Sequence, residues 1–176
     1  MNGFKIATAG VLAAAVLGAG AGGVATAAPA ATNDERTCRG TIGARSLDVD
    51  IRVPSGATCR LSGTRVDGNV KVYRGATLIA TGVRVGGNIQ AENAKSVTVT
   101  GSRVGGSIQL KQGRGGPIAL TRNTVDSDIQ LFSNVGSSAI QRNVVGGNLQ
   151  CKSNRPRPTG VANRVEGNKE DQCARL

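Results

Sequence analysis

The run Val85-Gly-Gly-Asn-Ile-Gln-Ala91 decides the fold, because copies of it recur along most of the chain. The next copy, Val104-Gly-Gly-Ser-Ile-Gln-Leu110, begins 19 residues later. Seven copies align, the last of them degraded, and their leading residues are Leu47, Val66, Val85, Val104, Val125, Val145 and Val165. Successive leading residues are 19, 19, 19, 21, 20 and 20 positions apart. A near-constant period of this length indicates a repeat architecture.

Each period contains two short runs in which apolar and polar residues alternate, such as Val97-Thr-Val99 and Ile108-Gln-Leu110. Alternation at period two predicts strands, and glycine interrupts the runs too often for helices. One unit buries too few aliphatic side chains to be stable alone, whereas stacked units bury a continuous column. We therefore predict an all-β fold, a right-handed parallel β-helix (solenoid) of about seven coils with about 20 residues per coil.

The first residues have the features of an export signal. Lys5 provides a positive charge, the stretch that follows is apolar and rich in Ala and Gly, and Ala25-Thr-Ala27 fits a small-residue cleavage site. The alternative is a membrane anchor, because the stretch approaches the ~20 residues that span a bilayer. We predict a signal peptide over 1–27 with cleavage between 27 and 30, and a secreted or cell-wall-associated protein without a transmembrane anchor. Residues 28–37 are then a flexible mature N-terminus, and 38–176 form a single β-helix domain.

The four cysteines predict two disulfides in an exported chain. Cys38 and Cys59 are 21 residues apart, and Cys151 and Cys173 are 22 apart, which is about one coil in each case. Of the three possible connectivities, we therefore expect Cys38–Cys59 and Cys151–Cys173, as staples at opposite ends. Lys169 replaces the inward aliphatic residue of the last repeat, so we also expect a polar C-terminal cap and a monomer.

The composition excludes several classes of function. Without histidine there is no Ser-His-Asp or Cys-His catalytic set of the usual kind and no His-ligated metal. Tyr73 and Phe132, the aromatic residues beyond the leader, are too few for a base-stacking platform, so no specific nucleic-acid partner is expected. The acidic residues are scattered. We predict a protein that is not an enzyme, with no catalytic residue, metal or cofactor; the alternative is a minimal carbohydrate-active β-helix enzyme, a polysaccharide lyase or hydrolase.

Polar residues at fixed places in the repeat form columns along the solenoid. Asn69, Asn88, Asn148 and Asn168 predict a structural ladder of stacked amides at one corner. Gln90, Gln109, Gln130 and Gln150 face outward, and they predict either a solvated ladder that adds rigidity or a face that reads polysaccharide. Thr81, Thr100 and Thr121 also align, which leaves open binding to ice or another crystal surface if the array proves broad and flat.

The charge of the chain is strongly positive, with 22 Lys and Arg against 11 Asp and Glu. Arg65, Arg84 and Arg103 directly precede leading valines. The column resumes at Arg164, while Arg122 and Arg142 lie one step around the same corner. Guanidinium groups ~5 Å apart repel unless anions lie between them. We therefore expect these arginines to contact an anionic cell-wall polymer, such as a phosphate-bearing one, or an acidic glycan; the alternative is a plain solvated surface.

The repeats from Ile42 to Asp171 resemble the right-handed parallel β-helix superfamily, the pectin-lyase-like superfold, but the catalytic motifs of its enzymes have no counterpart here. The terminal string from Asn148-Leu-Gln-Cys151 to Asn168-Lys-Glu-Asp-Gln-Cys173 is similar to the tail of small secreted actinobacterial proteins of unknown function. That resemblance implies a bacterial source and export, and it implies no activity.

Overall fold

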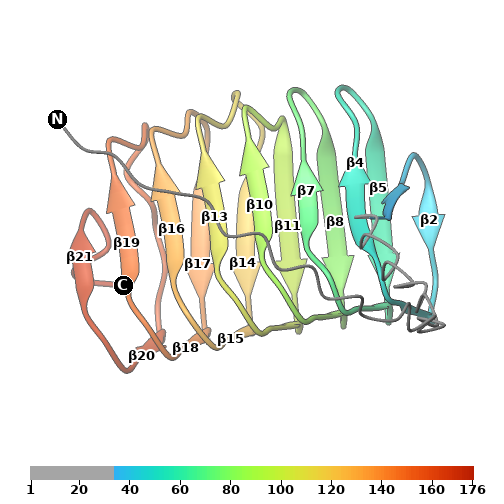
Figure 1. Cartoon of the computed structure of the whole chain (residues 1–176). Helices are drawn as coiled ribbons and strands as arrows, with labels where there is room; N and C mark the ends of the chain where they lie inside the picture. Colours follow the sequence, from blue (N-terminus) through green and yellow to red (C-terminus); the bar gives the residue numbers. More distant parts are fainter. Residues whose placement is uncertain (1–33) are drawn as a thin grey trace, which may run out of the picture. The chain divides into compact units, whose positions relative to one another are not determined.

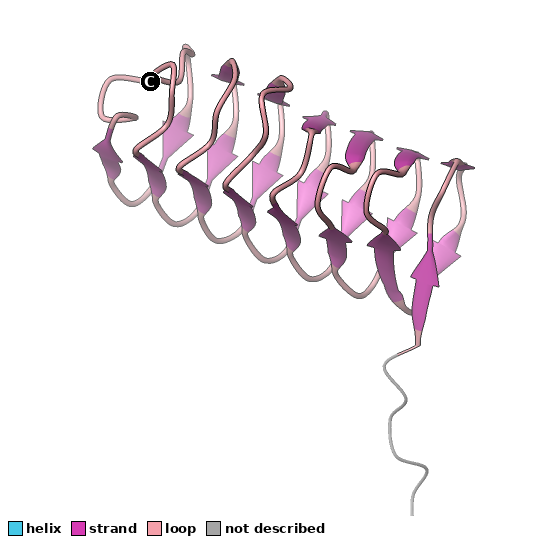
Figure 2. Cartoon of the chain, turned by 90° about the horizontal axis from the view of Figure 1, so that it is seen from above, coloured by secondary structure: helices cyan, strands magenta, loops and turns pink. Residues whose placement is uncertain are grey.

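The computed structural model of the chain describes residues 34–176, in which every regular element is a β-strand (Figure 1). The predicted signal peptide over 1–27 and its cleavage site lie outside the described residues. Asn33–Leu176 forms one compact unit, in which successive coils lie side by side (Figure 2). The strands join into three parallel sheets, which we call sheets A, B and C. The predicted parallel β-helix of about seven coils is therefore confirmed.

The central coils contribute one short strand to each sheet, in the chain order C, A, B, whereas the first coil has no strand in sheet C and the last two have none in sheet B. Sheet A contains β1 (Glu35–Thr37), β4 (Asp50–Val53), β7 (Val70–Val72), β10 (Ile89–Glu92), β13 (Ile108–Lys111), β16 (Ile129–Phe132), β19 (Leu149–Lys152) and β21 (Lys169–Asp171). Sheet B contains β2 (Thr41–Ile42), β5 (Thr58–Ser62), β8 (Thr77–Thr81), β11 (Ser96–Thr100), β14 (Ile118–Thr121) and β17 (Ser138–Gln141). Sheet C contains β3 (Ser46–Leu47), β6 (Arg65–Val66), β9 (Arg84–Val85), β12 (Arg103–Val104), β15 (Thr124–Val125), β18 (Val144–Val145) and β20 (Arg164–Val165).

The β-helix starts earlier than the sequence predicts. Glu35–Thr37, which we expected to lie in a flexible N-terminus, forms β1 and pairs in parallel with β4. Glu35 also approaches two basic side chains of the next coils, with its carboxylate 3.7 Å from Arg52 Nη1 and 3.4 Å from Lys71 Nζ. Strand pairing and these charge contacts hold Glu35–Thr37 on sheet A. The repeat pattern in the sequence begins only after this segment, so the pattern could not predict either interaction.

The core is the stacked aliphatic column that the alternation predicts. In sheet A, Ile89 pairs with Val70 on one side and with Ile108 on the other, and all three are buried. Leu120 of sheet B and Val104 of sheet C are buried in the same cluster. Each buried aliphatic side chain contributes about 1.5–3 kcal/mol relative to exposure. The column ends at Lys169, which pairs with Leu149 in the last coil and is only half-buried.

The turns between the sheets need unusual backbone conformations. Before sheet C the chain passes through the left-handed region, at Gly82 with φ 61° and at Gly101 with φ 58°. Arg122 and Arg142 take the same place in later coils, with φ 55° and 54°. Non-glycine residues pay about 1–2 kcal/mol for this conformation, and the contacts at this turn described below offset that cost.

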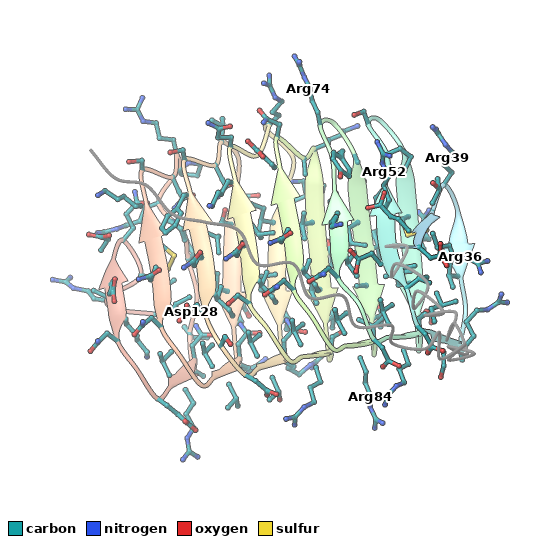
Figure 3. The ribbon with its side chains drawn as sticks, in the orientation of Figure 1. Arg36, Arg39, Arg52, Arg74, Arg84 and Asp128 are labelled. Atoms are coloured by element: carbon teal, nitrogen blue, oxygen red, sulfur yellow. A yellow bond between two sulfur atoms is a disulfide. The ribbon has the colours of Figure 1, made fainter. Side chains whose placement is uncertain are left out.

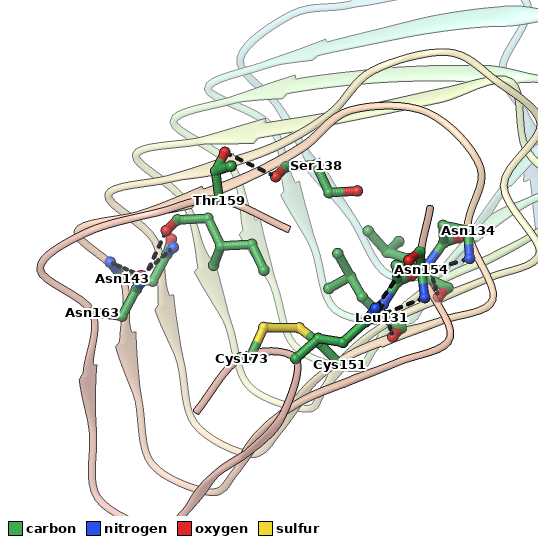
Figure 4. The surroundings of a disulfide bond; sticks show 12 residues. Leu131, Asn134, Ser138, Asn143, Cys151, Asn154, Thr159, Asn163 and Cys173 are labelled. Atoms are coloured by element: carbon green, nitrogen blue, oxygen red, sulfur yellow. Dashed lines mark hydrogen bonds between the residues drawn. A yellow bond between two sulfur atoms is a disulfide. The ribbon is translucent and has the colours of Figure 1, made fainter. Parts of the chain in front are cut away.

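Both ends of the core are closed by a disulfide. Cys59 is an inward residue of β5 and pairs with Cys38, which follows β1; their Cα atoms are 5.5 Å apart. Cys151 of β19 pairs with Cys173, which follows β21, at a Cα–Cα distance of 5.2 Å (Figure 4). All four cysteines are buried. The predicted pairing is therefore confirmed. Within residues 34–176 no helix is long and apolar enough to cross a membrane.

Candidate functional site

The predicted arginine column lies on the outer face of sheet C. Arg84 pairs in register with Arg65 on one side and with Arg103 on the other. Neighbouring strands of a sheet lie ~4.8 Å apart, so the three arginines start from a regular row. The next two places in the register are held by Thr124 and Val144, and Arg164 follows them. The continuous part of the column is therefore three arginines long.

Two of these three arginines contact a carboxylate. Arg65 Nε donates to Asp67 Oδ1 at 2.8 Å, and Arg103 Nη2 lies 3.0 Å from both carboxylate oxygens of Asp126. Arg84, between them, has no carboxylate oxygen within 4.0 Å among residues 34–176. Figure 3 shows Arg84 pointing away from the ribbon. The centre of the column therefore carries an uncompensated positive charge.

The three arginines border a groove of about 170 Å³ whose floor includes Gly86 and Gly105. A Cβ at Gly105 would lie 2.5 Å from the carbonyl oxygen of Gly86, and one at Gly86 would lie 2.6 Å from that of Asp67. The coils could not stack this closely with larger residues at these places. Asp67 and Asp126 hold the corresponding place in the coils on either side, so the carboxylates lie at Arg65 and Arg103 and not at Arg84.

Two of the other predicted arginines lie near the column but outside it. Arg122 and Arg142 stand in the left-handed turn between sheets B and C, in the place that Gly101 holds in an earlier coil. Arg45 was missed, although it lies 20 residues before Arg65, and its carbonyl accepts the Arg65 N–H at 2.8 Å. With it, every coil has one arginine at or beside this corner, namely Arg45, Arg65, Arg84, Arg103, Arg122, Arg142 and Arg164.

The predicted asparagine ladder runs along the turn between sheets C and A. Asn69 Oδ1 accepts the backbone N–H of Asn88 at 2.9 Å, and Asn148 Oδ1 accepts that of Asn168 at 2.8 Å. Asp50, Ser107 and Asp128 fill the other places and accept in the same way. These side chains form hydrogen bonds to the neighbouring coil, so their role is structural.

Two further ladders were missed, and both are buried (Figure 4). In the turn between sheets B and C, Asn143 Oδ1 accepts the Asn123 N–H at 3.0 Å and Asn143 Nδ2 donates to the Leu120 carbonyl at 2.9 Å. Asn163 continues this ladder. In the turn between sheets A and B, the members are Asn134, Asn154 and Gln172. The spacing of 20 residues from Asn123 to Asn143 and to Asn163 was the signal that could have identified the first of them.

The glutamine column lies on the outer face of sheet A. Gln90 Nε2 donates to Gln109 Oε1 at 3.3 Å, and Gln130 Nε2 donates to Gln150 Oε1 at 3.0 Å. Gln150 in turn donates to Glu170 at 2.9 Å. Arg52 and Lys71 precede the glutamines in the same register. The glutamines therefore form two hydrogen-bonded pairs in one row on the surface.

Threonines and serines cover much of the outer face of sheet B. Thr81, Thr100 and Thr121 are in register, and Ser62 extends their column. A second column on the same face contains Thr58, Thr77 and Ser96, and Thr98 lies between the two columns. The hydroxyl array is therefore broader than the single column that the sequence indicated.

Several acidic side chains each contact a different neighbouring group. The backbone N–H of Asn69 and the ammonium of Lys71, 2.8 Å from the carboxylate, lower the pKa of Asp50. Asp126 pairs with Arg103, and Asp128 accepts the Asn148 N–H at 2.7 Å. In the part of the chain that the structure describes, no three Asp, Glu, His or Cys side chains are placed to hold a metal ion.

Comparisons of the chain with protein-family models, with curated proteins and with solved structures find no match.

Proposed function

We propose that this protein is a non-enzymatic, secreted or cell-wall-associated binding protein that contacts an anionic envelope polymer through Arg65, Arg84 and Arg103. The observation that supports the proposal best is the register of the three arginines on adjacent strands, with Arg84 unpaired between its neighbours. A guanidinium group binds phosphate and carboxylate in a bidentate manner, and a row of them matches a polymer with regularly spaced anions.

The ion pairs of Arg65 and Arg103 do not prevent such binding. Their side chains are 57% and 62% exposed, and those of Asp67 and Asp126 are 45% and 41% exposed. Exposed ion pairs contribute only about 0–1 kcal/mol, so an incoming phosphate can replace the carboxylate at small cost. Because each contact is weak, affinity depends on several anions of one polymer engaging the row together.

The compartment and the source belong to the same proposal. The two disulfides are consistent with an extracellular, oxidising location. A cleaved leader over 1–27, and a place among small secreted actinobacterial proteins with a right-handed, pectin-lyase-like fold, fit that location. Sequencing the N-terminus of the protein recovered from culture medium tests the export part, since an uncleaved Met1 would contradict it.

The binding proposal is tested with poly(glycerol phosphate) and polygalacturonate at two ionic strengths. The variant carries Arg65→Gln, Arg84→Gln and Arg103→Gln together. The control carries Arg60→Gln, Arg74→Gln and Arg157→Gln, which removes the same charge from exposed arginines elsewhere. We expect the native protein and the control to bind one of the polymers at low salt, and the column variant to bind at least about 10-fold more weakly. Equal losses in the two variants, or no binding by the native protein, would contradict the proposal.

The hydroxyl array of sheet B supports a second candidate function, binding to a crystal surface such as ice. Its columns repeat every ~4.8 Å across the strands and every ~6.6 Å along them. The column between them contains Arg60 and Ile79 besides Thr98, and the repeat of the hydroxyl groups in two directions is what could match a solid lattice. Thr98→Lys, in the middle of the array, should then abolish any inhibition of ice recrystallisation, while Arg84→Gln should leave it intact. Absence of inhibition by the native protein excludes this candidate.

A further inference from the structure

Both aromatic side chains of residues 34–176 belong to one outward column of sheet A. Tyr73 directly follows β7 and stands beside Glu92, because its neighbour Val72 pairs with Ala91. The column continues through Lys111 to Phe132. Three strand spacings separate the two rings, which amounts to roughly 14 Å. Tyr73 is 38% exposed and Phe132 is half-buried, so both rings are accessible to a ligand on this face.

The ring of Tyr73 borders a groove. On the side of the preceding coil, the guanidinium of Arg52 lies 4.8 Å from the ring centroid. On the side of the following coils is a groove of about 300 Å³, lined by Tyr73, Gln90, Glu92, Gln109 and Lys111 among others. The cation–π contact holds the ring, so that the ring forms one wall of the groove.

The glutamines beside the groove are fixed and still have free hydrogen-bonding capacity. Gln90 Nε2 donates one hydrogen to Gln109 Oε1. A side-chain amide has two N–H hydrogens and two oxygen lone pairs, so this bond leaves one N–H and both lone pairs of Gln90 free, and both N–H hydrogens and one lone pair of Gln109. A ligand that uses them meets groups that have already lost their rotamer freedom, which reduces the entropic cost of binding.

The groove is electrically balanced, unlike the arginine column on sheet C. Glu92 and Lys111 are direct neighbours in register. Lys71, which also lines the groove, lies 2.8 Å from the carboxylate of Asp50 and 3.4 Å from that of Glu35. A polyanion gains little here, whereas an uncharged ligand rich in hydroxyl groups matches both the amides and the absence of net charge.

We propose that this groove binds a neutral polysaccharide, with one pyranose ring stacked on Tyr73 and the chain running alongside the glutamine column toward Phe132. The C–H groups of a pyranose face are attracted to the negative face of an aromatic ring. Its hydroxyl groups donate to and accept from the free positions of Gln90 and Gln109. The site lies on a different sheet from the arginine column and takes a ligand of different chemistry. Together with the proposed function, it would let one molecule bridge a neutral glycan and an anionic polymer.

Tyr73 makes the proposal directly measurable, because it is the only tyrosine and the chain has no tryptophan. The purified protein is titrated with cellohexaose, chitohexaose and laminarihexaose while the tyrosine fluorescence is recorded. We expect at least one hexasaccharide to change the emission saturably, and the apparent Kd to change less than 2-fold between 50 and 500 mM NaCl. If none of the three changes the emission or the mobility of the protein in affinity electrophoresis, the proposal is wrong.

Variants identify the groove, and affinity electrophoresis in the same glycan measures their binding. Tyr73→Ala and Gln109→Ala should each weaken binding at least about 5-fold, and Tyr73→Phe, which keeps the ring, less than 3-fold. Gln141→Ala, an outward glutamine of sheet B, is the matched control and should bind as the native protein does. Unchanged binding by both Tyr73→Ala and Gln109→Ala, or loss in Gln141→Ala, would overturn the assignment. The triple arginine variant should keep its glycan binding, so failure on sheet C leaves this test intact.

Discussion

Replacing Asn143 by alanine should destabilise the protein far more than a change at the exposed end of an asparagine ladder. Asn143 is fully buried in the turn between sheets B and C. Its Oδ1 accepts from Asn123 N at 3.0 Å and from Asn123 Nδ2 at 3.1 Å, and its Nδ2 donates to the Leu120 carbonyl at 2.9 Å and to Asn163 Oδ1 at 3.0 Å. Asn143→Ala therefore removes these four buried hydrogen bonds and leaves the Asn123 N–H without a partner, whereas the Leu120 carbonyl keeps the Gln141 N–H of the sheet.

The magnitude follows from these losses. A buried polar group that loses its partner costs about 1–3 kcal/mol and a further lost hydrogen bond about 0.5–1.5 kcal/mol, so the free energy of unfolding should fall by roughly 2–5 kcal/mol. For a domain of this size, that corresponds to a Tm about 5–15 °C lower. Denaturant and thermal unfolding with both disulfides intact measure the loss. Amide hydrogen exchange adds a local readout, because the Asn123 N–H should exchange much faster in the variant.

Asn168→Ala is the control, since Asn168 belongs to the predicted ladder but lies exposed in the last coil. Its N–H donates to Asn148 Oδ1 at 2.8 Å, and this bond survives the substitution. The control should stay within about 0.5 kcal/mol of the native protein. If Asn143→Ala is also within about 1 kcal/mol and the Asn123 amide remains protected, then the buried ladders do not stabilise the fold and the reasoning is refuted.

Three further changes have predictable effects. The pKa of Asp50 is lower in the folded protein than its unfolded value of ~3.9. The ionised carboxylate therefore stabilises the fold above the unfolded pKa, and this stabilisation is lost as the pH falls through the folded pKa. Asp50→Asn should flatten the dependence of Tm on pH between about pH 2 and 4. Removing the C-terminal disulfide with Cys151→Ala and Cys173→Ala opens a ~22-residue loop and should cost about 3 kcal/mol in urea unfolding. Gly87→Ala places a Cβ 2.5 Å from Asn69 Oδ1 and should lower the unfolding free energy by more than about 1 kcal/mol.

Each of these predictions has a control and an opposing outcome. For Asp50→Asn the control is Asp48→Asn, which removes an exposed carboxylate from the first repeat and should leave the dependence of Tm on acid pH unchanged. If Asp48→Asn flattens this dependence as much as Asp50→Asn does, the contacts of Asp50 are not its cause. Equal urea midpoints for the disulfide variant and the native protein would show that the C-terminal staple is dispensable. For Gly87→Ala the control is Gly43→Ala, because no atom lies within 4 Å of a Cβ at Gly43. Similar unfolding free energies for the two variants would mean that the neighbouring turn moves to accept the methyl group at little cost.

The repeat alone determined which residues are neighbours along the solenoid. Because the period is 19–21 residues, the sequence brought Arg65 beside Arg84, Gln90 beside Gln109, and each cysteine beside its partner. The alternation of apolar and polar residues determined which side chains enter the core. Inward residues such as Ile89 and Leu110 could therefore be read from the pattern, and so could the positions of the strands that carry them.

The tertiary structure decided how the turns bend, and with that which polar groups are buried. Asn143 and Asn69 both stand in turns and both recur with the period, yet one is fully buried and the other only half-buried. The repeat also does not show which arginines of the column form ion pairs. In the structure the Asp126 side chain extends to Arg103 in the preceding coil, while Arg84 stays unpaired. Tyr73 and Phe132 each stand seven residues after a leading valine, so the repeat already places both rings in one column. Only the folded coils show that Tyr73 borders a groove and that the Arg52 guanidinium lies over its ring.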